Sequence, residues 1–534
     1  MASVGDCGLP AIGRPAGLGT FQPAGMGRAD YHERGKSVMI TASLLLMTVV
    51  LPLGSLLLAF RQRWQKVYLY SLPLLPVPAL LAGLNAELQN WLELPWLLLD
   101  GTWGLDDLRQ SFLLLTSALW ATAGIYAIGY LNTRKLRAFC VFWALTLTGN
   151  LGLIISVDLA SFYSFFALMT FAAYGLVVHE GTAEANRAGR VYLTIAVAGE
   201  MALLTGLLMA AQHADSILLT ELPGAIANYD RSWLIIGLLV SGFGVKAGLP
   251  FLHFWLPLAH PVAPTPASAV LSGAMIKAGL LGWLVTLPIG ELSLPGWGNT
   301  LVVLGATGAI GGAMLGMMHI RPKTILAYSS ISQMGLITLM VGAAMANAAQ
   351  TATLLTAITL YALHHGLAKG CLFLSTAIKM PAERRSRRLV WLLIGVPGLS
   401  LAGLPLTSGA AAKLAMKDAL KPEQYDFTLA EHLPLIMSAG AVATMLLIWR
   451  FFWALHQSVR TGPNHRCTWL GWLFATGCSL VAVWFLPGVW THSGQPWFVL
   501  TASEGWSLIW PILIATAMSI GWWIARGRKG SGVD

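Results

Sequence analysis

The sequence predicts an all-α fold, a polytopic membrane protein with about 14–15 transmembrane helices. Of its 534 residues, 56% are hydrophobic and 10% are charged, whereas a soluble domain has about 25% charged residues. Apolar stretches long enough to cross a bilayer recur along the chain, separated by short polar links. These stretches lie at residues 38–60, 67–84, 104–130, 138–156, 159–178, 191–211, 232–250, 266–288, 299–318, 324–345, 351–377, 390–416, 433–455, 468–488 and 507–525.

The first 37 residues differ from the rest of the chain. They are rich in Gly, Ala and Pro, have mixed charge and contain no apolar run. They therefore do not fit a signal peptide, which has an apolar stretch after its basic start. We predict a disordered tail at 1–37, or translation upstream of a true start at Met26 or Met39. The predicted N-terminal helices follow at 38–137.

Charge is distributed unevenly between the links. The links after odd-numbered spans hold most of the Lys and Arg residues, and the links after even-numbered spans are mainly acidic. Because cytoplasmic loops carry an excess of Lys and Arg, the pattern predicts an inner-membrane protein with a cytoplasmic C-terminus. It also accounts for the net charge of +10 without a nucleic-acid partner, since the basic residues are spread over short loops. The basic run at 384–388 is interpreted as a topology anchor, with a lipid or partner site as the alternative.

Four lysines lie inside apolar stretches: Lys246, Lys277, Lys369 and Lys413. A charge near the bilayer centre costs roughly 2.5–3.5 kcal/mol on translocon-based scales, so we expect all four to face the bundle interior or a wet cavity. Desolvation disfavours the charged form of an amine, and a row of buried amines can therefore pass protons along through water. The alternative for each lysine is a side chain that snorkels to the membrane interface.

Two stretches contain Pro and Gly where a membrane helix should continue. The first, GFGVKAGLPFLHFWLPLAHP, contains Pro250 and Pro257, and the second, LSLAGLPLTSGAAAKLAMKD, contains Gly403 and Pro405. Each Pro removes a helix hydrogen bond. Transporters carry such broken helices at matching places of two structural repeats, with the binding site at the breaks. The sequence therefore predicts two broken helices that flank the ion pathway.

The spacing of the two breaks predicts a duplicated architecture. A repeat of five spans brings them into the same position, and an odd number of spans gives the two copies opposite orientation in the membrane. We therefore predict a first inverted repeat at 138–288 and a second at 299–455. Further C-terminal helices and a basic tail are expected at 456–534.

The chain contains no motif for covalent chemistry or for a tightly bound cofactor. Five cysteines are scattered without a CxxC pair, which argues against iron–sulfur, haem c and structural zinc sites. No Gly-rich phosphate loop follows a strand pattern, and no GxSxG, HExxH or HxE…CxxC pattern occurs. We therefore expect no cofactor, no metal site and no intrinsic catalytic site.

Four blocks, in consistent order, resemble one known family. The most diagnostic is GFGVKAGLPFLHFWLPLAHPVAPTPASAVLSGAMIKAGLLGWL at 242–284, supported by RPKTILAYSSISQMGLI at 321–337, LHHGLAKGCLFL at 363–374 and LAGLPLTSGAAAK at 401–413. Over about residues 100–455 the chain resembles the antiporter-like proton-translocating subunits shared by respiratory complex I, membrane-bound hydrogenases and Mrp cation/proton antiporters. The AHPVAPTPASA segment is most similar to the hydrogenase and complex I subunit-5 branches.

The resemblance implies roles for the four lysines. By position, Lys246 ends the input half-channel, Lys277 connects the two halves, Lys369 relays protons and Lys413 ends the output half-channel.

The same resemblance implies relay roles for His253 in the first broken helix and for His364 or His365 beside Lys369. Hydrogen-bonded interior histidines are the alternative for these three. His260 and His319 lie at span ends and are expected to be structural.

One departure from the family concerns the partner of Lys246. Pumping members carry a glutamate in the fifth span, but residues 158–178 hold no carboxylate after Asp158, and Ala167 stands at the glutamate position. The nearest intramembrane acid is Glu200, in the sixth span. We hypothesise that Glu200 replaces the missing glutamate. The alternative is a subunit that lacks this charge switch and conducts ions differently or poorly.

The resemblance implies a proton-conducting membrane subunit of a complex I-like or hydrogenase-like assembly, held among other membrane subunits in the bilayer. The alternatives are an Mrp-type Na⁺/H⁺ antiporter subunit, the proton-conducting partner of a soluble bicarbonate-accumulating, carbonic-anhydrase-like protein, and a structural scaffold. Sodium sites favour oxygen ligands, whereas lysines dominate this interior, so H⁺ is favoured over Na⁺. In a redox complex the chain would be labelled an NADH:quinone oxidoreductase or hydrogenase membrane subunit without transferring electrons.

Overall fold

The protein is described here from a computed structural model that covers residues 28–85, 91–97, 99–131, 135–426, 428–481 and 501–530. The tail predicted at 1–37 lies outside these residues up to position 27. Residues 28–37 of the predicted tail are helical, since helix α1 already begins at Arg28. The first helix therefore starts ten residues before the apolar stretch, since the polar segment before it continues the same helical turns.

The described chain is almost entirely helical. Its elements are α1 (Arg28–Ser55), η1 (Leu56–Phe60), η2 (Gln62–Trp64), α2 (Gln65–Ser71), α3 (Val77–Asn85), β1 (Leu92–Leu94), β2 (Gly101–Trp103), α4 (Asp107–Tyr130), α5 (Leu136–Ile155), α6 (Leu159–Val177), α7 (Ala183–Ala214), α8 (Leu222–Ala227), α9 (Ser232–Ala247), α10 (Trp255–Val262), α11 (Thr265–Val270), η3 (Leu271–Met275), α12 (Ile276–Thr286), α13 (Pro295–Met317), α14 (Pro322–Ala346), η4 (Ala348–Gln350), α15 (Thr351–Ser375), α16 (Arg384–Ala402), α17 (Ser408–Ala419), η5 (Pro422–Gln424), η6 (Ala430–His432), α18 (Leu433–Ser458), α19 (Arg466–Val481) and α20 (Ala502–Gly530).

Within the described residues, nine helices are long and apolar enough to cross a membrane. They are Met39–Phe60, Asp107–Tyr130, Leu136–Ile155, Leu159–Val177, Ala183–Ala214, Thr265–Thr286, Pro295–Met317, Pro322–Ala346 and Ala430–Ser458. The other predicted spans correspond to shorter or less apolar helices: α2 with α3, α9, α15, α16 with α17, α19 and α20. The prediction of about 14–15 spans counted these as well, and α15 is less apolar because it carries His364, His365 and Lys369.

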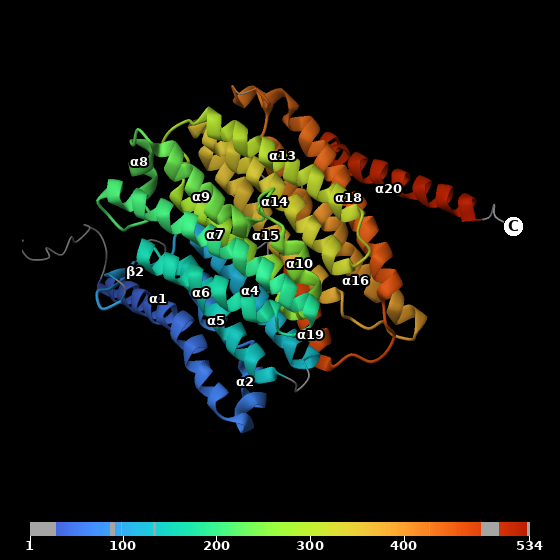
Figure 1. Ribbon diagram of the computed structural model, residues 1–534, viewed down its shortest axis with the longest axis horizontal. Helices are drawn as coiled ribbons and strands as arrows, with labels where there is room; N and C mark the ends of the chain where they lie inside the picture. The colour runs from blue at the N-terminus through green and yellow to red at the C-terminus, as the bar shows by residue number, and fades with distance from the viewer. Residues whose placement is uncertain are drawn as a thin grey trace, which may run out of the picture.

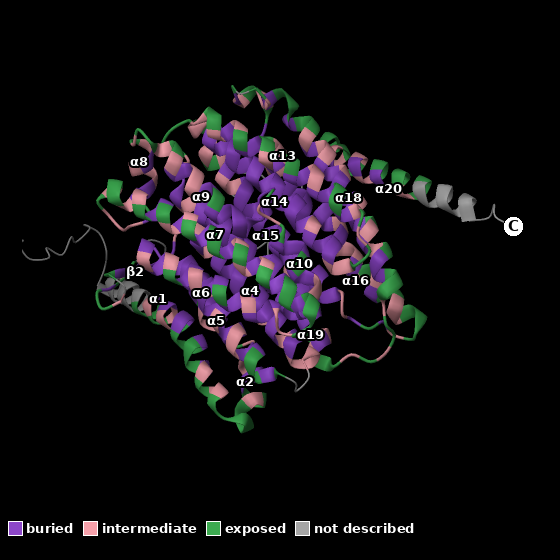
Figure 2. Ribbon diagram, viewed as in Figure 1, coloured by how far each residue is buried: buried purple, intermediate pink, exposed green. Residues whose placement is uncertain are grey.

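The helices form a bundle with two fully covered elements at its centre. In an apolar 18-residue window of each span, all residues of Thr265–Thr286 are buried and 94% of those of α14, but only 28% of those of Met39–Phe60. Figure 1 shows α14 and α15 in the middle of the bundle, with α1 and α20 at its edges. Figure 2 shows the same gradient, from a buried centre to an exposed rim. Lys277 and Lys369, on these central helices, are accordingly buried.

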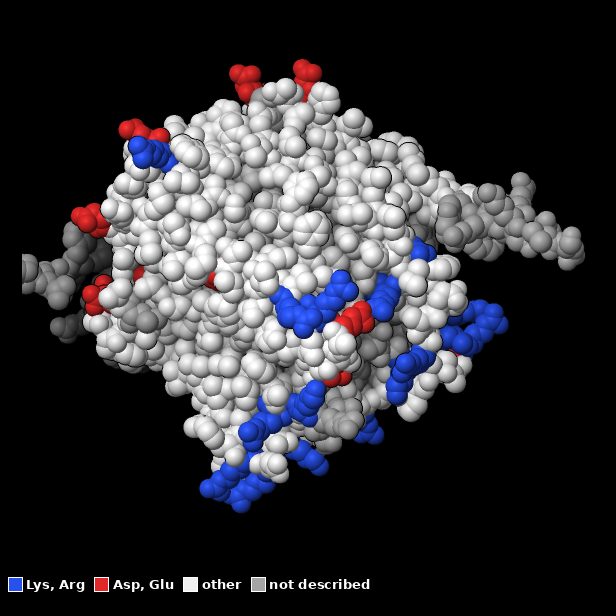
Figure 3. All heavy atoms as spheres, in the orientation of Figure 1, with Lys and Arg blue, Asp and Glu red and all other residues white. Residues whose placement is uncertain are grey.

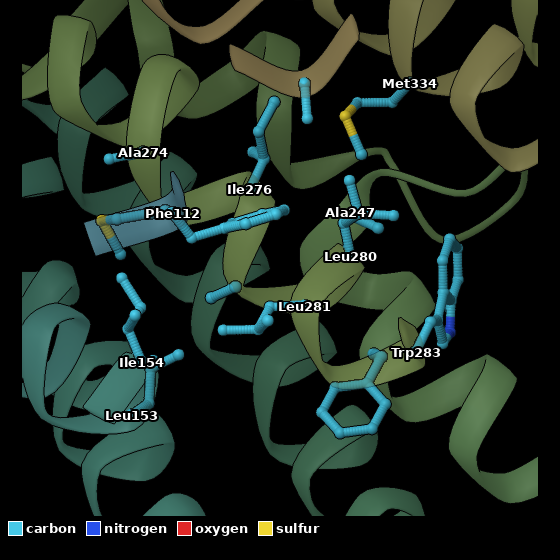
Figure 4. Packing of buried hydrophobic residues seen from close by; sticks show 14 of the residues in the cluster. Phe112, Leu153, Ile154, Ala247, Ala274, Ile276, Leu280, Leu281, Trp283 and Met334 are labelled. Carbon is cyan, nitrogen blue, oxygen red and sulfur yellow. The ribbon is translucent and has the colours of Figure 1, made fainter. Parts of the chain in front are cut away.

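Close packing around α12 sets the geometry of this centre. A Cβ atom at Gly279 would lie 2.5 Å from the carbonyl oxygen of Phe243 in α9, and one at Gly282 would lie 2.1 Å from the Phe243 ring. Only glycine leaves room for this approach. In Figure 4, side chains of α4, α5, α9, α12 and α14 meet around α12, among them Phe112, Ile154 and Leu280. The same packing holds Lys277, at the start of α12, inside the bundle.

A short hairpin closes one end of the bundle. Strands β1 and β2 pair antiparallel, with Leu92 opposite Trp103. The buried carboxylate of Asp158 accepts hydrogen bonds from the backbone N–H groups of Thr102 (2.8 Å) and Ser161 (2.7 Å). Asp158 thus caps α6 and fixes the hairpin to it.

Charged side chains separate between the two ends of the molecule. Figure 3 shows most of the visible Lys and Arg residues at the end that includes α2, α16 and α19, and most of the visible carboxylates toward α8 and β2 at the other end. This separation is what the link composition predicted. That the basic end is cytoplasmic stays a prediction.

Candidate ion-translocation site

The first helix break lies between α9 and α10. Helix α9 ends at Ala247, and Gly248 follows with φ +79°. The break contains Pro250 as predicted, and Phe251 also has positive φ, at +69°. Pro257 does not break a helix, because it is the third residue of α10, where its missing N–H would have no intrahelical partner.

The second break, between α16 and α17, has the same backbone path. Gly403 follows α16 with φ +93°, and Leu406, three residues later, has φ +62°. Pro405 lies between them. The residue after each glycine donates a backbone hydrogen bond to the carbonyl five residues earlier: Leu249 to Gly244 (2.9 Å) and Leu404 to Leu399 (3.0 Å). Both breaks are therefore Gly-terminated helix ends of the Schellman type, built on the same Gly-Leu-Pro sequence.

Lys246 lies in the last turn of α9 and is held mainly by aromatic groups. Its side chain is buried, and its Nζ donates a hydrogen bond to the Tyr192 hydroxyl at 3.2 Å. The ammonium also lies 5.8 Å from the ring centroid of Phe166, 5.4 Å from that of Tyr192 and 5.9 Å from that of Trp255. A desolvated cation–π contact contributes about 2 kcal/mol. We call these three residues the aromatic cage of Lys246.

Glu200 lies in the same cavity but does not touch Lys246 directly. The cavity is lined by Phe166, Thr170, Tyr192, Ala196, Glu200, Gly242, Val245, Lys246 and Trp255. Both carboxylate oxygens of Glu200 are buried, and neither has a hydrogen-bond partner among the described residues. The volume open to the centre of a water molecule is about 10 Å³, about the least that admits one water. The cavity that holds both the carboxylate and the ammonium thus has room for about one water.

Ala167, the position of the family glutamate, is not part of this cavity. Ala167 is half-buried, and α6 contributes Phe166 and Thr170 to the lining instead. A carboxylate facing Lys246 from α6 would therefore stand at one of these two positions.

Lys277 is the lysine of the four that is hydrogen-bonded to a histidine. Its Nζ lies 2.8 Å from His365 Nδ1 and donates to the Ser272 carbonyl at 3.2 Å. Lys277 and His365 are both buried, and the contact joins α12 to α15. The amine and the ring can exchange a proton through this single hydrogen bond.

His364 extends the contact toward the second break. Its Nδ1 lies 2.8 Å from the Ser408 hydroxyl, at the start of α17. The outer ring nitrogens of His364 and His365 (Nε2 in each) are buried without a partner among the described residues. Lys369, one helical turn from His365, donates to the Leu326 carbonyl at 3.0 Å.

Lys413 is held by the end of a helix. Its Nζ donates to the carbonyl of Ala402, the last residue of α16, at 2.6 Å. A cation is favourable there because the C-terminal carbonyls of a helix carry partial negative charge. A Cβ atom at Gly403 would lie 2.7 Å from Lys413 Cδ, so Gly403 supplies both the turn and the space for the side chain.

Two further histidines considered in the sequence analysis, His253 and His260, lie apart from this line. His253, predicted as a relay residue, is half-buried in the first break and contacts the rings of Phe254 and Tyr328. It contacts none of the four lysines. His260, expected to be structural, is fully buried and stacks on Phe373, and neither ring nitrogen has a hydrogen-bond partner in the part of the chain that the structure describes.

Sequence reasoning missed several buried polar residues. The Tyr361 hydroxyl donates to Gln333 Oε1 at 2.8 Å, and Gln333 Nε2 donates to Thr444 Oγ1 at 2.8 Å. The hydroxyls of Ser272 and Ser330 lie 2.7 Å apart. The run SSISQ inside α14 was the available signal, since five largely polar residues in a buried helix need partners. Within the described residues, no three His, Cys, Asp or Glu side chains converge as a metal site requires.

The chain matches known proteins over most of its described length. It is 30% identical over 291 residues to hydrogenase-4 component B of Escherichia coli K12, covering 52% of this chain and 43% of that protein. It is 28% identical over 463 residues to Na⁺/H⁺ antiporter subunit A1 of Staphylococcus haemolyticus, covering 78% of this chain and 57% of that protein. The chain thus spans about half the length of the curated relatives it matches.

The fold matches a solved membrane complex. A chain of the Mrp complex from Dietzia sp. DQ12-45-1b superposes with a TM-score of 0.75 and 21% sequence identity, covering 91% of this chain and 56% of that one. Residues 156–430, about half of the chain, match the family model described as NADH:quinone oxidoreductase/Mrp antiporter, TM. The protein therefore belongs to the NADH:quinone oxidoreductase/Mrp antiporter family of multi-pass membrane subunits.

Proposed function

We propose that this chain conducts protons as a membrane subunit of a multi-subunit complex, through a relay of buried Lys and His side chains. The observation that carries the proposal is the contact of 2.8 Å between Lys277 Nζ and His365 Nδ1 at the buried centre. A lysine in a membrane interior is costly, and a stable structural role would not require a titratable partner. A proton-exchanging pair explains why both groups are present.

The relay continues from this pair in both directions. Toward the second break it runs through His364, Ser408 and Lys413, and toward the first break through Lys246 and Glu200. No hydrogen bond between protein groups joins Lys246 to Lys277 or Lys413 to His364, so these steps depend on water. Buried polar atoms without protein partners are where ordered waters are expected, and the free nitrogens of His364 and His365 stand at such positions.

Glu200 acts in this proposal as the acid that the fifth span lacks. Its carboxylate lines the cavity that also holds the Lys246 ammonium. A water between them would let Lys246 alternate between the aromatic cage and a water-bridged ion pair. Movement of the Lys246 ammonium toward or away from Glu200 would raise or lower the proton affinity of Lys246, because an opposite charge nearby favours the ammonium. Lys246 stands at the start of the relay.

The duplicated break motif supports the proposed division into inverted repeats at 138–288 and 299–455. In this arrangement the two breaks open toward opposite sides of the inner membrane. The basic end, with the C-terminus, faces the cytoplasm. Neighbouring membrane subunits of the same complex would cover the sides of the bundle.

The proposal is tested in the intact complex, isolated in mild detergent and reconstituted into vesicles. Lys277→Met is expected to lower proton uptake by about 100-fold or more, because general acid–base groups contribute at least that much to proton transfer. Lys417→Gln is the matched control: Lys417 lies in α17, one turn beyond Lys413, and donates to the Ser507 carbonyl at 2.8 Å outside the relay. Equal uptake by wild type and Lys277→Met, measured with a pH-sensitive dye, would contradict the proposal.

The second candidate function is Na⁺/H⁺ antiport, which the similarity to Na⁺/H⁺ antiporter subunit A1 favours. An antiporter would show proton movement that depends on an opposing Na⁺ gradient. A redox-driven or bicarbonate-linked subunit would show none. The chains that copurify in mild detergent distinguish a redox-driven from a bicarbonate-linked subunit. A redox-driven subunit requires redox subunits beside it, and a bicarbonate-linked subunit requires a soluble zinc protein.

A further inference from the structure

A large hollow opens at the basic end of the bundle, outside the proposed relay. It is lined by the ends of α4 and α10, the starts of α7, α14 and α19, and the loops after α15 and α18, and its volume open to the centre of a water molecule is about 630 Å³. Four of its lining residues are Lys or Arg: Arg321, Lys323, Lys379 and Arg460. We call this hollow the basic vestibule.

Negative charge in the vestibule does not balance these cations. Among the residues that line it, the single carboxylate is that of Glu184, which forms an ion pair with Arg321. The Lys323 ammonium donates to the Ala263 carbonyl at 2.8 Å. Lys379 and Arg460 form no ion pair with any described residue, and His465 lies beside them. The vestibule therefore has an excess of positive charge in a hollow that is open to one side of the protein.

Two helix starts add to this charge. Helix α14 begins in the vestibule wall without a side-chain cap or an acidic residue in its first turn, and with Arg321 and Lys323 flanking Pro322. Helix α19 begins at Arg466, next to His465, also without an acid in its first turn. The N-terminus of a helix carries partial positive charge and attracts anions. Cations at this position are unfavourable by themselves and become favourable when an anion binds between them.

The walls that carry Lys379 and Arg460 are fixed to one another. Asn464 accepts a hydrogen bond from the Lys379 N–H at 3.0 Å and donates one to the Lys379 carbonyl at 2.7 Å. The Met380 N–H donates to the Arg460 carbonyl at 2.8 Å, and the Gly462 N–H donates to the Met380 carbonyl at 3.2 Å. Loops that served only as topology anchors would not need this bracing. Preorganised walls reduce the entropy cost of binding a ligand.

We propose that the basic vestibule binds a phosphate-type anion, either the phosphate of an anionic phospholipid headgroup or free phosphate. Lys and Arg are the residues that recognise phosphate oxygens. Basic pockets between membrane helices on the cytoplasmic side hold such headgroups. This inference concerns a binding site distinct from the relay and does not depend on proton transport.

The experiment measures binding to the purified full-length protein. Native mass spectrometry counts phosphatidylglycerol and phosphatidylcholine retained after titration, and calorimetry measures inorganic phosphate. Lys379→Gln/Arg460→Gln is expected to weaken binding by about tenfold or more, the scale of a lost charge-assisted hydrogen bond. The control is Arg61→Gln/Arg63→Gln, which removes the same charge from exposed residues beside Trp64 at the same end of the protein.

One supporting result is that the wild type prefers phosphatidylglycerol and that only the vestibule variant loses this preference. The anion in the vestibule is then a lipid phosphate. Binding of inorganic phosphate with the same dependence, without lipid preference, supports the site with free phosphate as its source. Equal loss in both variants, or no anion binding by wild type, overturns the proposal. So does occupation by an acidic segment of a copurifying subunit. If the Gln variant does not fold, Asn464→Ala, which unties the loops without removing charge, replaces it, with weaker binding again expected.

Discussion

The two helix breaks have the same backbone but different surroundings. Gly248 and Gly403 both end a helix with positive φ, and a bulky residue three positions later repeats that conformation. The lysines, however, are held differently. Lys246 lies in an aromatic cage with an acid in the same cavity, whereas Lys413 is bound to the carbonyl end of α16.

This difference shows which contacts of each lysine come from the helix break itself and which come from the neighbouring helices. The break exposes helix-end carbonyls inside the bundle, where they favour a cation. At the second break Lys413 uses such a carbonyl directly. At the first break Lys246 is held by three rings and one hydroxyl, and the acid in the same cavity can attract its charge away from them. We therefore expect the first break to be the more switchable of the two.

The largest expected effect is on the structure of the second break. A Cβ atom at Gly409 would lie 1.7 Å from the Ser400 carbonyl oxygen and 3.0 Å from the His364 ring. Gly409→Ala is therefore expected to destabilise the protein by about 3 kcal/mol or more, measured as a lower Tm in detergent. Gly244→Ala in the first break meets only movable Leu side chains at 3.1 Å and is the control. Equal Tm values for the two variants would show that the second break is not tightly packed.

The next effect concerns the acid of the first break. Glu200→Gln is expected to reduce proton uptake about tenfold or more, because it removes the charge that moves Lys246. Glu184→Gln, which removes an exposed carboxylate from the start of the same helix, is expected to have little effect. Unchanged uptake in Glu200→Gln would mean that Lys246 functions without a carboxylate partner.

A second-site change tests which face of α6 matters. In the Glu200→Gln background, Thr170→Glu is expected to restore part of the uptake, because Thr170 lines the cavity of Lys246. Ala167→Glu is expected to restore none, because Ala167 lies outside that lining. Rescue by Ala167→Glu alone would show that α6 rotates during function or that the family position is the relevant one.

A smaller effect is expected from the aromatic cage. Tyr192→Phe keeps the ring near Lys246 but removes the hydroxyl that accepts its hydrogen bond. Uptake should change about three- to tenfold, within the range for one hydrogen bond to a charged group. Tyr174→Phe, which changes a half-buried tyrosine of α6 outside the cavity lining, serves as the control. A larger effect than that of Glu200→Gln would make the hydroxyl, rather than the acid, the principal partner of Lys246.

The smallest effect tests whether the two breaks are equivalent. Phe251 and Leu406 both have positive φ and are 69% and 66% exposed. A non-glycine residue in this conformation costs roughly 1–2 kcal/mol. Replacing either with Gly should therefore change stability by about 1 kcal/mol or less, with the same sign in both, as measured by thermal unfolding. Stability changes of opposite sign would show that Phe251 and Leu406 are strained to different extents although their backbone conformations match.

Much of the fold was predictable because its signals are local. The apolar stretches located the helices, although α1 and α7 begin ten and eight residues before the predicted spans. The cost of a charge in lipid correctly placed all four lysines in the interior. The breaks at Pro250 and Pro405 were predictable from the effect of Pro on a helix. Pro257 misled the prediction because the harm done by a Pro depends on where the helix begins, and α10 begins only at Trp255.

The candidate site was predictable as a set of residues but not as a set of contacts. The sequence indicated Lys277 and His365, yet nothing in their spacing joins them, because they lie on different helices. It also predicted His253 as a relay residue, but could not predict its neighbours, Phe254 and Tyr328.

The sequence by itself determined that this protein is a helical membrane bundle with interior lysines and two broken helices, because hydropathy, charge cost and Pro geometry act over a few neighbouring residues. Only the tertiary structure decided which groups meet: Lys246 with its aromatic cage, Lys277 with His365, and Lys413 with the end of α16. The physical reason is helix rotation. If α6 were rotated about its axis by the angle between two successive residues, Ala167 would face the cavity in place of Phe166. The packing of the whole bundle sets that rotation.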